Sequence, residues 1–262
     1  MFRELLDRLI KPRASPEQEF EAYLEACILP ELKSRADELE VTKEQTVEAL
    51  RRRREISDIV AEAFMAVPRE EFVHPRLREF AYWDCPLPIC YDQTISQPTL
   101  VLKMLTRLEV NHSNRILEVG AGSGYAAALL GKLAAKVVAT EIVPELTRQA
   151  TERMQKLGLD NVSVIHTKYG QTGYAEGAPY ERILVSASAP DIPEELVAQL
   201  SIGGIMLLPR VFNLEDGHRP FDAQKPPRQA VFLYRKAKQR VINEEVAMFP
   251  VLFVPLKYGT WR

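Results

Sequence analysis

The feature that most constrains this chain is a set of three glycines within five residues, placed directly after an apolar run that ends in an acid. The stretch reads Arg115-Ile116-Leu117-Glu118-Val119-Gly120-Ala121-Gly122-Ser123-Gly124-Tyr125, and an Ala- and Leu-rich segment follows it. The pattern predicts a buried strand, a tight turn and a helix. Glycine allows positive φ and a close approach of bare backbone to a ligand, and the start of a helix offers unpaired N–H groups. We therefore expect a nucleotide-binding turn.

The spacing of the glycines narrows the choice of ligand. G-x-G-x-G is tighter than the G-x-G-x-x-G that seats a dinucleotide pyrophosphate, so we expect an adenosine ligand without phosphates, with S-adenosylmethionine (SAM) the leading candidate. A second apolar run, 136–141, ends in Glu141, where a carboxylate can hold a ribose diol. The alternative is a tight strand–helix connection with no ligand. Glu118, the glycines and Glu141 together favour the cofactor site.

Composition excludes several classes of protein. The chain has 262 residues, of which 46% are hydrophobic and 27% charged, and a formal net charge of -2, which indicates a folded chain with no dedicated nucleic-acid or membrane surface. The three cysteines form no C-x-x-C pair and the four histidines are scattered, so neither a disulfide framework nor a metal site is expected. There is no apolar signal segment or membrane span, and we expect a cytoplasmic protein.

The order of predicted elements indicates an α/β fold. From about residue 99 to 210, apolar strands alternate with helices, which is typical of a Rossmann-like domain with a mostly parallel central sheet and helices on both faces. The expected helices are 99–108, 125–133 and 144–157, and the expected strands are 115–119, 136–141, 162–165, 182–186 and 205–208. Residues 211–228 form a Pro-, Gly- and charge-rich excursion, after which 230–234 and 251–254 are expected to close the sheet as an antiparallel pair.

An N-terminal helical extension is expected over residues 1–55, with the cofactor-binding α/β domain over 56–262. Apolar residues recur at helical spacing within 2–10. Ser15-Pro16-Glu17-Gln18 and Thr42-Lys43-Glu44-Gln45 both have the pattern of a helix start, and the second predicts one long helix to about Ala66. We interpret the four arginines 51–54 as a solvated helix face rather than a phosphate-binding patch, because acids lie nearby.

The segment before the glycine strand lacks a clear period but is rich in hydrogen-bonding side chains. Prolines punctuate residues 68–98, and long irregular segments in compact domains are often functional. We predict a substrate loop at about 82–98, followed by a cofactor core at about 99–210 and C-terminal strands at about 229–256. The alternative for the loop is a polar surface connection.

Several motifs in register carry a family resemblance. They are Pro68-Arg69-Glu70-Glu71-Phe72-Val73, Ala81-Tyr82-Trp83-Asp84, Gln93-Thr94-Ile95-Ser96-Gln97-Pro98, the glycine strand, Ala178-Pro179-Tyr180, Ser188-Ala189-Pro190 and Phe253-Val254-Pro255-Leu256. With these motifs the chain resembles the protein-L-isoaspartate O-methyltransferases over roughly residues 56–256. The Thr-Ile-Ser-Gln-Pro loop is more specific than the glycine motif, which Rossmann-like methyltransferases share.

The resemblance implies an enzyme that methylates carboxylates with SAM. Its substrates would be L-isoaspartyl, and D-aspartyl, residues of damaged proteins or peptides, and the ester would collapse to a succinimide that reopens partly as normal aspartate. The resemblance assigns the active site to Ser96, Thr94 and Asp84 and substrate contacts to Ile95, Gln97 and Gln229. It assigns the cofactor contacts to Glu118, Gly120, Ala121, Gly122, Gly124, Glu141, Ile142, Tyr169 and Gly170.

The chemistry of such a transfer fits a serine that positions rather than attacks. A carboxylate is already ionised at neutral pH, so its methylation needs no general base. The site must align the oxygen, the methyl carbon and the sulfonium, and exclude part of the water. A hydroxyl can hold the carboxylate in place, which is the role we predict for Ser96.

Three positions depart from the family pattern. Lys168-Tyr169-Gly170 stands where the family has Gly-Asp-Gly, so the acid expected at the adenine amino group is replaced by Tyr169. Cys90 and Asp92 replace glycines beside the substrate loop, which adds bulk and a negative charge. These departures leave two alternatives open: a divergent member that methylates another protein or peptide carboxylate, and a SAM-binding protein without catalysis.

Overall fold

The structure is a computed structural model that describes residues 15–212, 228–238, 240–251 and 253–256. The helices are α2 (Pro16–Tyr23), a π-helical turn η1 (Leu24–Ile28), α3 (Leu29–Ser34), α4 (Ala36–Leu39), α5 (Lys43–Arg52), α6 (Asp58–Ala66), α7 (Pro98–Arg107), α8 (Tyr125–Leu133), α9 (Pro144–Lys156), α10 (Glu194–Gln199) and the 3-10 turns η2 (Arg69–Phe72), η3 (Pro75–Phe80) and η4 (Ala175–Gly177). The strands are β1 (Leu87–Ile89), β2 (Gln93–Ile95), β3 (Arg115–Val119), β4 (Lys136–Glu141), β5 (Val162–His166), β6 (Tyr180–Val185), β7 (Leu200–Phe212), β8 (Arg228–Ala237) and β9 (Arg240–Val251).

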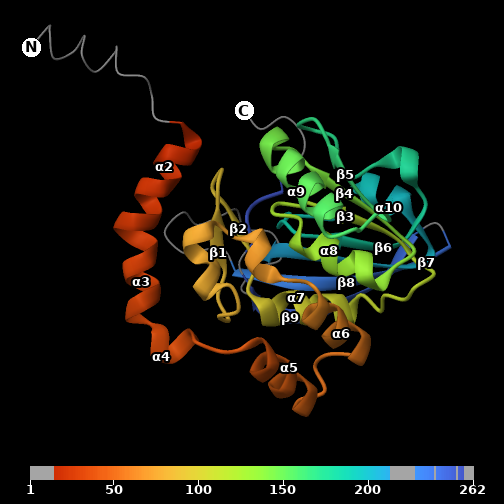
Figure 1. Ribbon diagram of the computed structural model, residues 1–262. Helices are drawn as coiled ribbons and strands as arrows, with labels where there is room; N and C mark the ends of the chain where they lie inside the picture. Colours follow the sequence, from red (N-terminus) through yellow and green to blue (C-terminus); the bar gives the residue numbers. More distant parts are fainter. Residues whose placement is uncertain (1–14, 213–227, 239, 252, 257–262) are drawn as a thin grey trace, which may run out of the picture.

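Among the described residues, seven strands form one sheet in the order β5-β4-β3-β6-β7-β8-β9 (Figure 1). Strands β3 to β7 pair in parallel, while β8 runs antiparallel to both β7 and β9. The chain winds outward from β3 to β5 and then returns to place β6 on the other side of β3. This reversal is a topological switch point, where open α/β sheets bind ligands at the carboxyl ends of the strands.

Alternation along the central strands sends their side chains to two separate cores. Ile116 of β3 belongs to the core shared with α6, α7 and α8, whereas Leu117 and Val119 belong to the core that contains Leu196 of α10. Successive side chains of a strand point to opposite faces, so both faces of the sheet are buried. The predicted Rossmann-like class, with helices on both faces, is confirmed.

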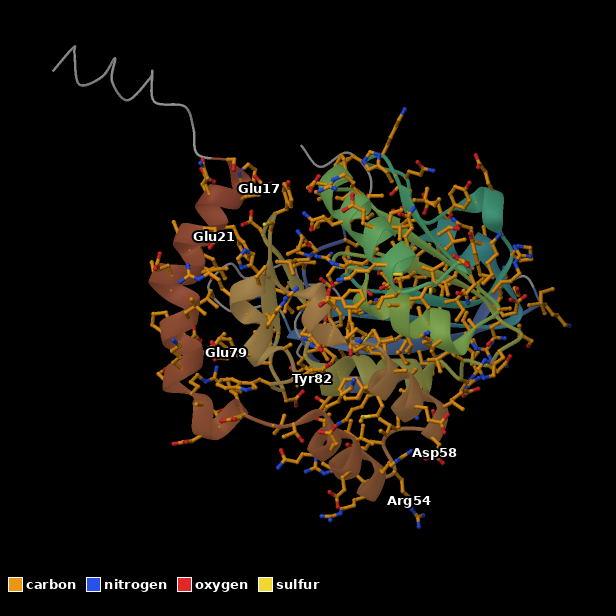
Figure 2. The ribbon with its side chains drawn as sticks, in the orientation of Figure 1. Glu17, Glu21, Arg54, Asp58, Glu79 and Tyr82 are labelled. Carbon is orange, nitrogen blue, oxygen red and sulfur yellow. The ribbon has the colours of Figure 1, made fainter. Side chains whose placement is uncertain are left out.

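The long helix expected after residue 42 is two helices. Both predicted starts form capping boxes, at Ser15 and at Thr42, but α5 ends at Arg52 and α6 begins at Asp58. Arg54 has φ +56°, a left-handed conformation that ends a helix. Figure 2 shows Arg54 and Asp58 at this corner. Exposed ion pairs of Arg51 with Asp58 and Arg52 with Glu48 agree with a solvated face.

Two other regions differ from the expectation. The irregular stretch within 82–98 contains a two-stranded hairpin, β1–β2, in which Leu87 pairs with Ile95. The partner of the predicted strand 230–234 is 240–251 rather than 251–254, because the tail at Val254 and Pro255 instead lies against Ser188. The predicted helical face at 2–10 and most of the 211–228 excursion fall outside the described residues. None of the described helices is both long and apolar enough to cross a membrane.

Candidate active site

The glycine turn adopts the conformation that its sequence predicts. Gly120, Gly122 and Gly124 have φ of +89°, +53° and +86°, which residues with a Cβ rarely adopt. The N–H groups of Gly120 and Ala121 both donate to the Thr140 carbonyl at 2.9 Å. The turn is thus fastened to the end of β4, and it leads directly into the first turn of α8.

Glu141 is a structural acceptor for this turn. Its Oε2 accepts the Gly122 N–H at 2.8 Å, and its Oε1 accepts the N–H groups of Ile142 at 2.8 Å and Val143 at 2.9 Å. A carboxylate offers about four acceptor positions, so about one remains for a ligand. We therefore expect Glu141 to keep its bond to the glycine turn and to accept a hydrogen bond from one of the two ribose hydroxyls, but not from both.

Glu118 is the most strongly perturbed acid of the site. It is 1% exposed, and its Oε1 accepts the Ser186 hydroxyl at 3.0 Å. Its Oε2 is buried without a hydrogen-bond partner in the described protein. Burial raises the pKa of Glu118 to about 8, partly offset by the Ser186 hydrogen bond, and Glu141 adds a smaller increase. An unpartnered buried oxygen of this kind is costly and suits a ligand that brings a donor or a positive charge.

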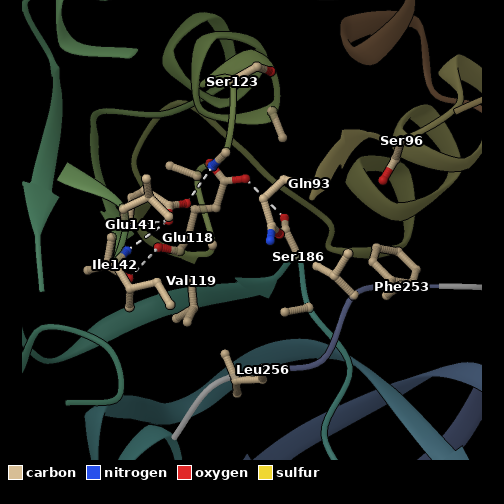
Figure 3. A pocket seen from close by; sticks show the side chains of 18 of the residues that line it. Gln93, Ser96, Glu118, Val119, Ser123, Glu141, Ile142, Ser186, Phe253 and Leu256 are labelled. Carbon is tan, nitrogen blue, oxygen red and sulfur yellow. Dashed lines mark hydrogen bonds between the residues drawn. The ribbon is translucent and has the colours of Figure 1, made fainter. Parts of the chain in front are cut away.

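These groups line a cavity of about 380 Å³ at the switch point of the sheet, a size typical of small-molecule sites. Figure 3 shows Glu118, Glu141 and Ile142 gathered on one side of it, with Ser96 on the other and Phe253 and Leu256 closing it from the C-terminal segment. The cavity therefore joins the glycine turn and the predicted substrate loop in one space.

The substrate-loop wall is the β1–β2 hairpin and the residues that follow it. Thr94, Ile95 and Ser96 line the cavity together with the hairpin turn at Tyr91 and Asp92. Tyr91 and Asp92 have φ of +66° and +54°, so they form a tight turn. Asp92, one of the departures from the family pattern, is thus placed at the cavity itself, whereas Cys90 does not line it.

Most of the residues predicted for the site meet in this cavity. Of the predicted set, those that line it are Thr94, Ile95, Ser96, Glu118, Gly120, Ala121, Gly122, Glu141 and Ile142. Those that do not line it are Asp84, Gln97, Gly124, Tyr169, Gly170 and Gln229. The residues of the second group lie away from the cavity wall, and several of them form hydrogen bonds with other parts of the protein instead.

Asp84 and Gln229 brace the cavity wall from outside. Asp84 accepts the Thr99 N–H at 3.1 Å and the Thr99 hydroxyl at 2.8 Å, so it caps the start of α7 instead of reaching the cavity. Gln229 is 3% exposed; its side-chain amide accepts the Phe253 N–H at 2.7 Å and donates to the Phe253 carbonyl at 3.2 Å. Gln229 thereby fixes Phe253, which does line the cavity.

Tyr169, at the position of the missing acid, lies away from the cavity wall. Its side chain is 49% exposed, and neither it nor Gly170 lines the cavity. The lining beyond β5 consists of Thr167, Gln171 and Thr172 instead. Sequence reasoning missed these residues because it carried over a position from the family pattern; the only local signal was their polarity just after the expected strand 162–165.

Further lining residues were not among the predicted site residues. Ser186 follows β6, the strand beside β3, and its contact with Glu118 could have been found only from the strand order. Phe253 and Leu256 were noted only as part of the family resemblance. Among the described residues, no group of three or more His, Cys, Asp or Glu is arranged to hold a metal ion.

Comparison with known proteins identifies the family. A family model described as protein-L-isoaspartate(D-aspartate) O-methyltransferase matches residues 41–260. The chain belongs to this family. It is 40% identical over 200 residues to a protein-L-isoaspartate O-methyltransferase of Ignicoccus hospitalis, covering 75% of this chain and 88% of the relative. It is 38% identical over 222 residues to one of Methanoculleus marisnigri, covering 84% and 94%.

Solved structures agree with this family assignment. A protein-L-isoaspartate O-methyltransferase of Plasmodium falciparum in complex with S-adenosyl-L-homocysteine superposes with a TM-score of 0.68 at 26% identity, covering 84% of this chain and all of that one. A second protein-L-isoaspartate O-methyltransferase gives a TM-score of 0.67 at 28% identity, covering 82% and 66%. The predicted family, its enzymatic methyl transfer and its SAM cofactor are confirmed.

Proposed function

We propose that this isoaspartyl methyltransferase binds SAM along the glycine turn and transfers its methyl group to the α-carboxylate of an isoaspartyl residue held at Thr94–Ser96. The observation that carries the proposal is the single cavity that contains both Glu118 and Ser96 on opposite sides (Figure 3). Binding two reactants in one cavity lowers the activation barrier, because the entropy cost of bringing them together is met by binding. The protein partner is a damaged protein or peptide.

The donor set of the cavity fits SAM. The unpartnered Oε2 of Glu118 suits an ammonium group such as the one at the methionine end of SAM. The remaining acceptor position of Glu141 suits a ribose hydroxyl, and the polar side chains of Thr167, Gln171 and Thr172 lie at the end of the cavity beyond β5. We infer that Gln171, which lines the cavity, makes the adenine contact in place of Tyr169.

The chain's own residues supply binding and alignment rather than proton transfer. Bound SAM supplies an electrophilic methyl group. The Ser96 hydroxyl, which has no hydrogen-bond partner among the described residues, can donate to one oxygen of the substrate carboxylate and leave the other free to attack the methyl carbon. Ile95 and Phe253 exclude water from this region. The transfer forms the O–CH₃ bond and breaks the S–CH₃ bond, yielding a neutral methyl ester.

A labelled-methyl assay tests this function. Purified protein is incubated with methyl-labelled SAM and an isoaspartyl peptide, beside a twin peptide that differs only in a normal aspartyl linkage. We expect base-labile methyl ester on the isoaspartyl peptide alone. No ester on that peptide, with normal SAM binding by calorimetry, would overturn the proposal.

A second candidate is methylation of a different carboxylate. It is favoured by the exposed Asp92 at the cavity edge, because a fixed negative charge disfavours a second carboxylate close by. Equal turnover of unrelated isoaspartyl peptides would count against it. Preference for one partner sequence, lost in Asp92→Gly, would support it.

A further inference from the structure

Arg69 is a buried cation without a buried anion. It lies in η2 and is 0% exposed. Its Nε donates to the Ala81 carbonyl at 2.6 Å, its Nη2 donates to the Ser96 carbonyl at 2.7 Å, and its guanidinium carbon lies 4.8 Å from the centre of the Tyr125 ring. No carboxylate within the described ranges pairs with it, and its Nη1 is buried without a well-formed hydrogen bond. A buried charge left in this condition is unfavourable for folding alone.

The surroundings of Arg69 connect both sides of the cavity. Tyr125 begins α8 directly after the glycine turn, and Ser96 follows the substrate hairpin; both line the cavity. Arg69 itself does not line it, so the guanidinium lies behind the wall. Burial lowers the pKa of Arg69 from its ordinary value, but guanidinium groups remain protonated in proteins. The wall at Ser96 is therefore backed by a fixed positive charge.

The bond from Arg69 also sets the orientation of a peptide unit. In the trans peptide between Ser96 and Gln97, the N–H of Gln97 points opposite to the Ser96 carbonyl. Because that carbonyl is directed at Arg69, the Gln97 N–H is directed away from the guanidinium, beside Ser96, which lines the cavity although Gln97 itself does not. Neither this N–H nor the Ser96 hydroxyl forms a hydrogen bond with any described residue. Donation to the carbonyl also polarises the peptide unit and strengthens its N–H as a donor.

We propose that Arg69 is a positioning residue that acts through the Ser96–Gln97 peptide unit, so that the Ser96 hydroxyl and the Gln97 N–H form a two-donor seat for the substrate carboxylate. The seat rests on the proposed function, because it assumes a carboxylate substrate at Ser96. Its net positive potential is complementary to that anion. The predicted substrate contact of Gln97 would then be made by its main chain, not by its side chain, which instead donates to Thr99.

The test separates substrate binding from cofactor binding. In Arg69→Gln we expect the KM for an isoaspartyl peptide to rise at least tenfold, with the Kd for S-adenosylhomocysteine within twofold of wild type. Arg69→Lys keeps the charge but cannot hold both carbonyls, so its KM should lie between that of wild type and that of Arg69→Gln. An unchanged KM in a folded Arg69→Gln protein, or a parallel rise in KM and Kd, would overturn the proposal.

A second pair of variants tests the seat without touching the buried cation. Gln97 has φ −56°, which proline also adopts, so Gln97→Pro deletes the N–H at little conformational cost. We expect its KM to exceed that of Gln97→Ala, which keeps the N–H, by at least fivefold. Equal KM values in these two variants would overturn the role of the N–H.

Tyr82→Phe is the matched control for the η2 turn. Tyr82 accepts the Arg69 N–H at 3.1 Å and donates to Glu70, but no hydrogen bond joins it to Ser96; Figure 2 shows it beside the helices before η2. We expect a lower melting temperature and an unchanged KM. If Tyr82→Phe raised the KM as much as Arg69→Gln, general loosening of the turn would explain both, and the proposal would be wrong. If wild type fails to methylate isoaspartyl peptides at all, it is the proposed function that fails.

Discussion

The two sides of the cavity are built in different ways. The cofactor side comes from two adjacent strands and the turn between β3 and α8. Glu141 is held there by the backbone N–H groups of Gly122, Ile142 and Val143, and only the bond from Ser186 to Glu118 comes from a distant segment of the chain among the side-chain hydrogen bonds of these two acids in the described residues. The substrate side is assembled from distant segments: the β1–β2 hairpin, the η2 turn with Arg69, and the C-terminal residues at Phe253 and Leu256. The first is a local structure, while the second depends on long-range packing.

Helix α2 of the N-terminal extension contacts the substrate side. The Tyr91 hydroxyl at the hairpin turn donates to Glu17 of α2 at 3.1 Å, and Glu21 contacts His74 at 3.0 Å and Arg76 at 3.5 Å. Figure 2 shows Glu17 and Glu21 on the part of α2 nearest the hairpin. The family match begins at residue 41, so α2 lies outside the matched residues and meets the wall at the hairpin turn. Substitutions on the substrate side should alter the KM for the peptide. Substitutions on the cofactor side should alter SAM binding and folding.

The largest effect is expected from the titration of Glu118. Its pKa is raised from 4.5 to about 8 in the fold, so the folded protein keeps a proton that the unfolded chain loses. The free energy of unfolding should therefore fall as pH rises from 4.5 towards 8, by up to about 1.4 kcal/mol per pH unit. Glu118→Gln, which stays neutral, should lack this slope in urea unfolding measured across the range. Parallel pH profiles for the two proteins would contradict the assignment.

The same titration should be visible in ligand binding. An ammonium group placed against Glu118 favours the carboxylate, so S-adenosylhomocysteine should displace a proton when it binds below pH 8. Calorimetry in two buffers of different ionisation enthalpy measures that release. It should vanish in Glu118→Gln; proton release that persists in this variant would place the titrating group elsewhere.

Gly124→Ala should come next in size. A Cβ there would lie 3.0 Å from Ala150 Cβ and 3.1 Å from Met154 Cε, at a φ of +86°, so backbone strain and crowding of α9 add together. We expect a loss of roughly 2–4 kcal/mol of stability, measured by chemical denaturation. Gly120→Ala is the matched control, because its Cβ would meet nothing closer than 3.7 Å at a similar φ, and it should cost roughly 1–2 kcal/mol. Equal losses of stability in the two variants would show that α9 moves away from the added Cβ without a measurable energy cost.

Ser96→Ala should affect the substrate side alone. We expect kcat/KM for an isoaspartyl peptide to fall roughly 10- to 100-fold, as for the loss of one hydrogen bond to a charged group. The Kd for S-adenosylhomocysteine should stay within about twofold, since Ser96 lies across the cavity from Glu118. An unchanged kcat/KM would remove Ser96 from the site.

The smallest effect is expected where the extension meets the hairpin. Tyr91→Phe removes an exposed hydrogen bond to Glu17, and such bonds contribute little, so we expect the KM to change by less than about threefold. Tyr23→Phe on the same helix is the control, since Tyr23 is 48% exposed. A tenfold change in Tyr91→Phe would mean that α2 governs the substrate side far more than one hydrogen bond implies.

Local patterns predicted the cofactor side well. The strand, turn and helix from Arg115 to Leu133 have the expected bounds, and both capping boxes mark helix starts. These features are short-range: glycine conformation, apolar alternation and side-chain caps are set by residues a few positions apart. The break at Arg54 was missed because apolar spacing continued on both sides of it.

The substrate side was predicted by resemblance and was less exact. Asp84 and Gln229 were placed at the reacting groups, but they brace Thr99 and Phe253. Arg69 lay in a recognised motif, yet nothing local showed that its guanidinium would hold the Ser96 carbonyl. The two residues are 27 positions apart, and no periodic pattern in the sequence indicates a contact over that separation.

The sequence by itself thus determined the glycine turn, the acids Glu118 and Glu141 and the family, because these depend on local conformation and on residue types at fixed spacing. Only the tertiary structure decided which residues reach the cavity, that Gln171 rather than Tyr169 lines it, and that a buried arginine backs Ser96. The physical reason is that burial and the direction of a side chain depend on the strand order and on packing between segments far apart in the chain.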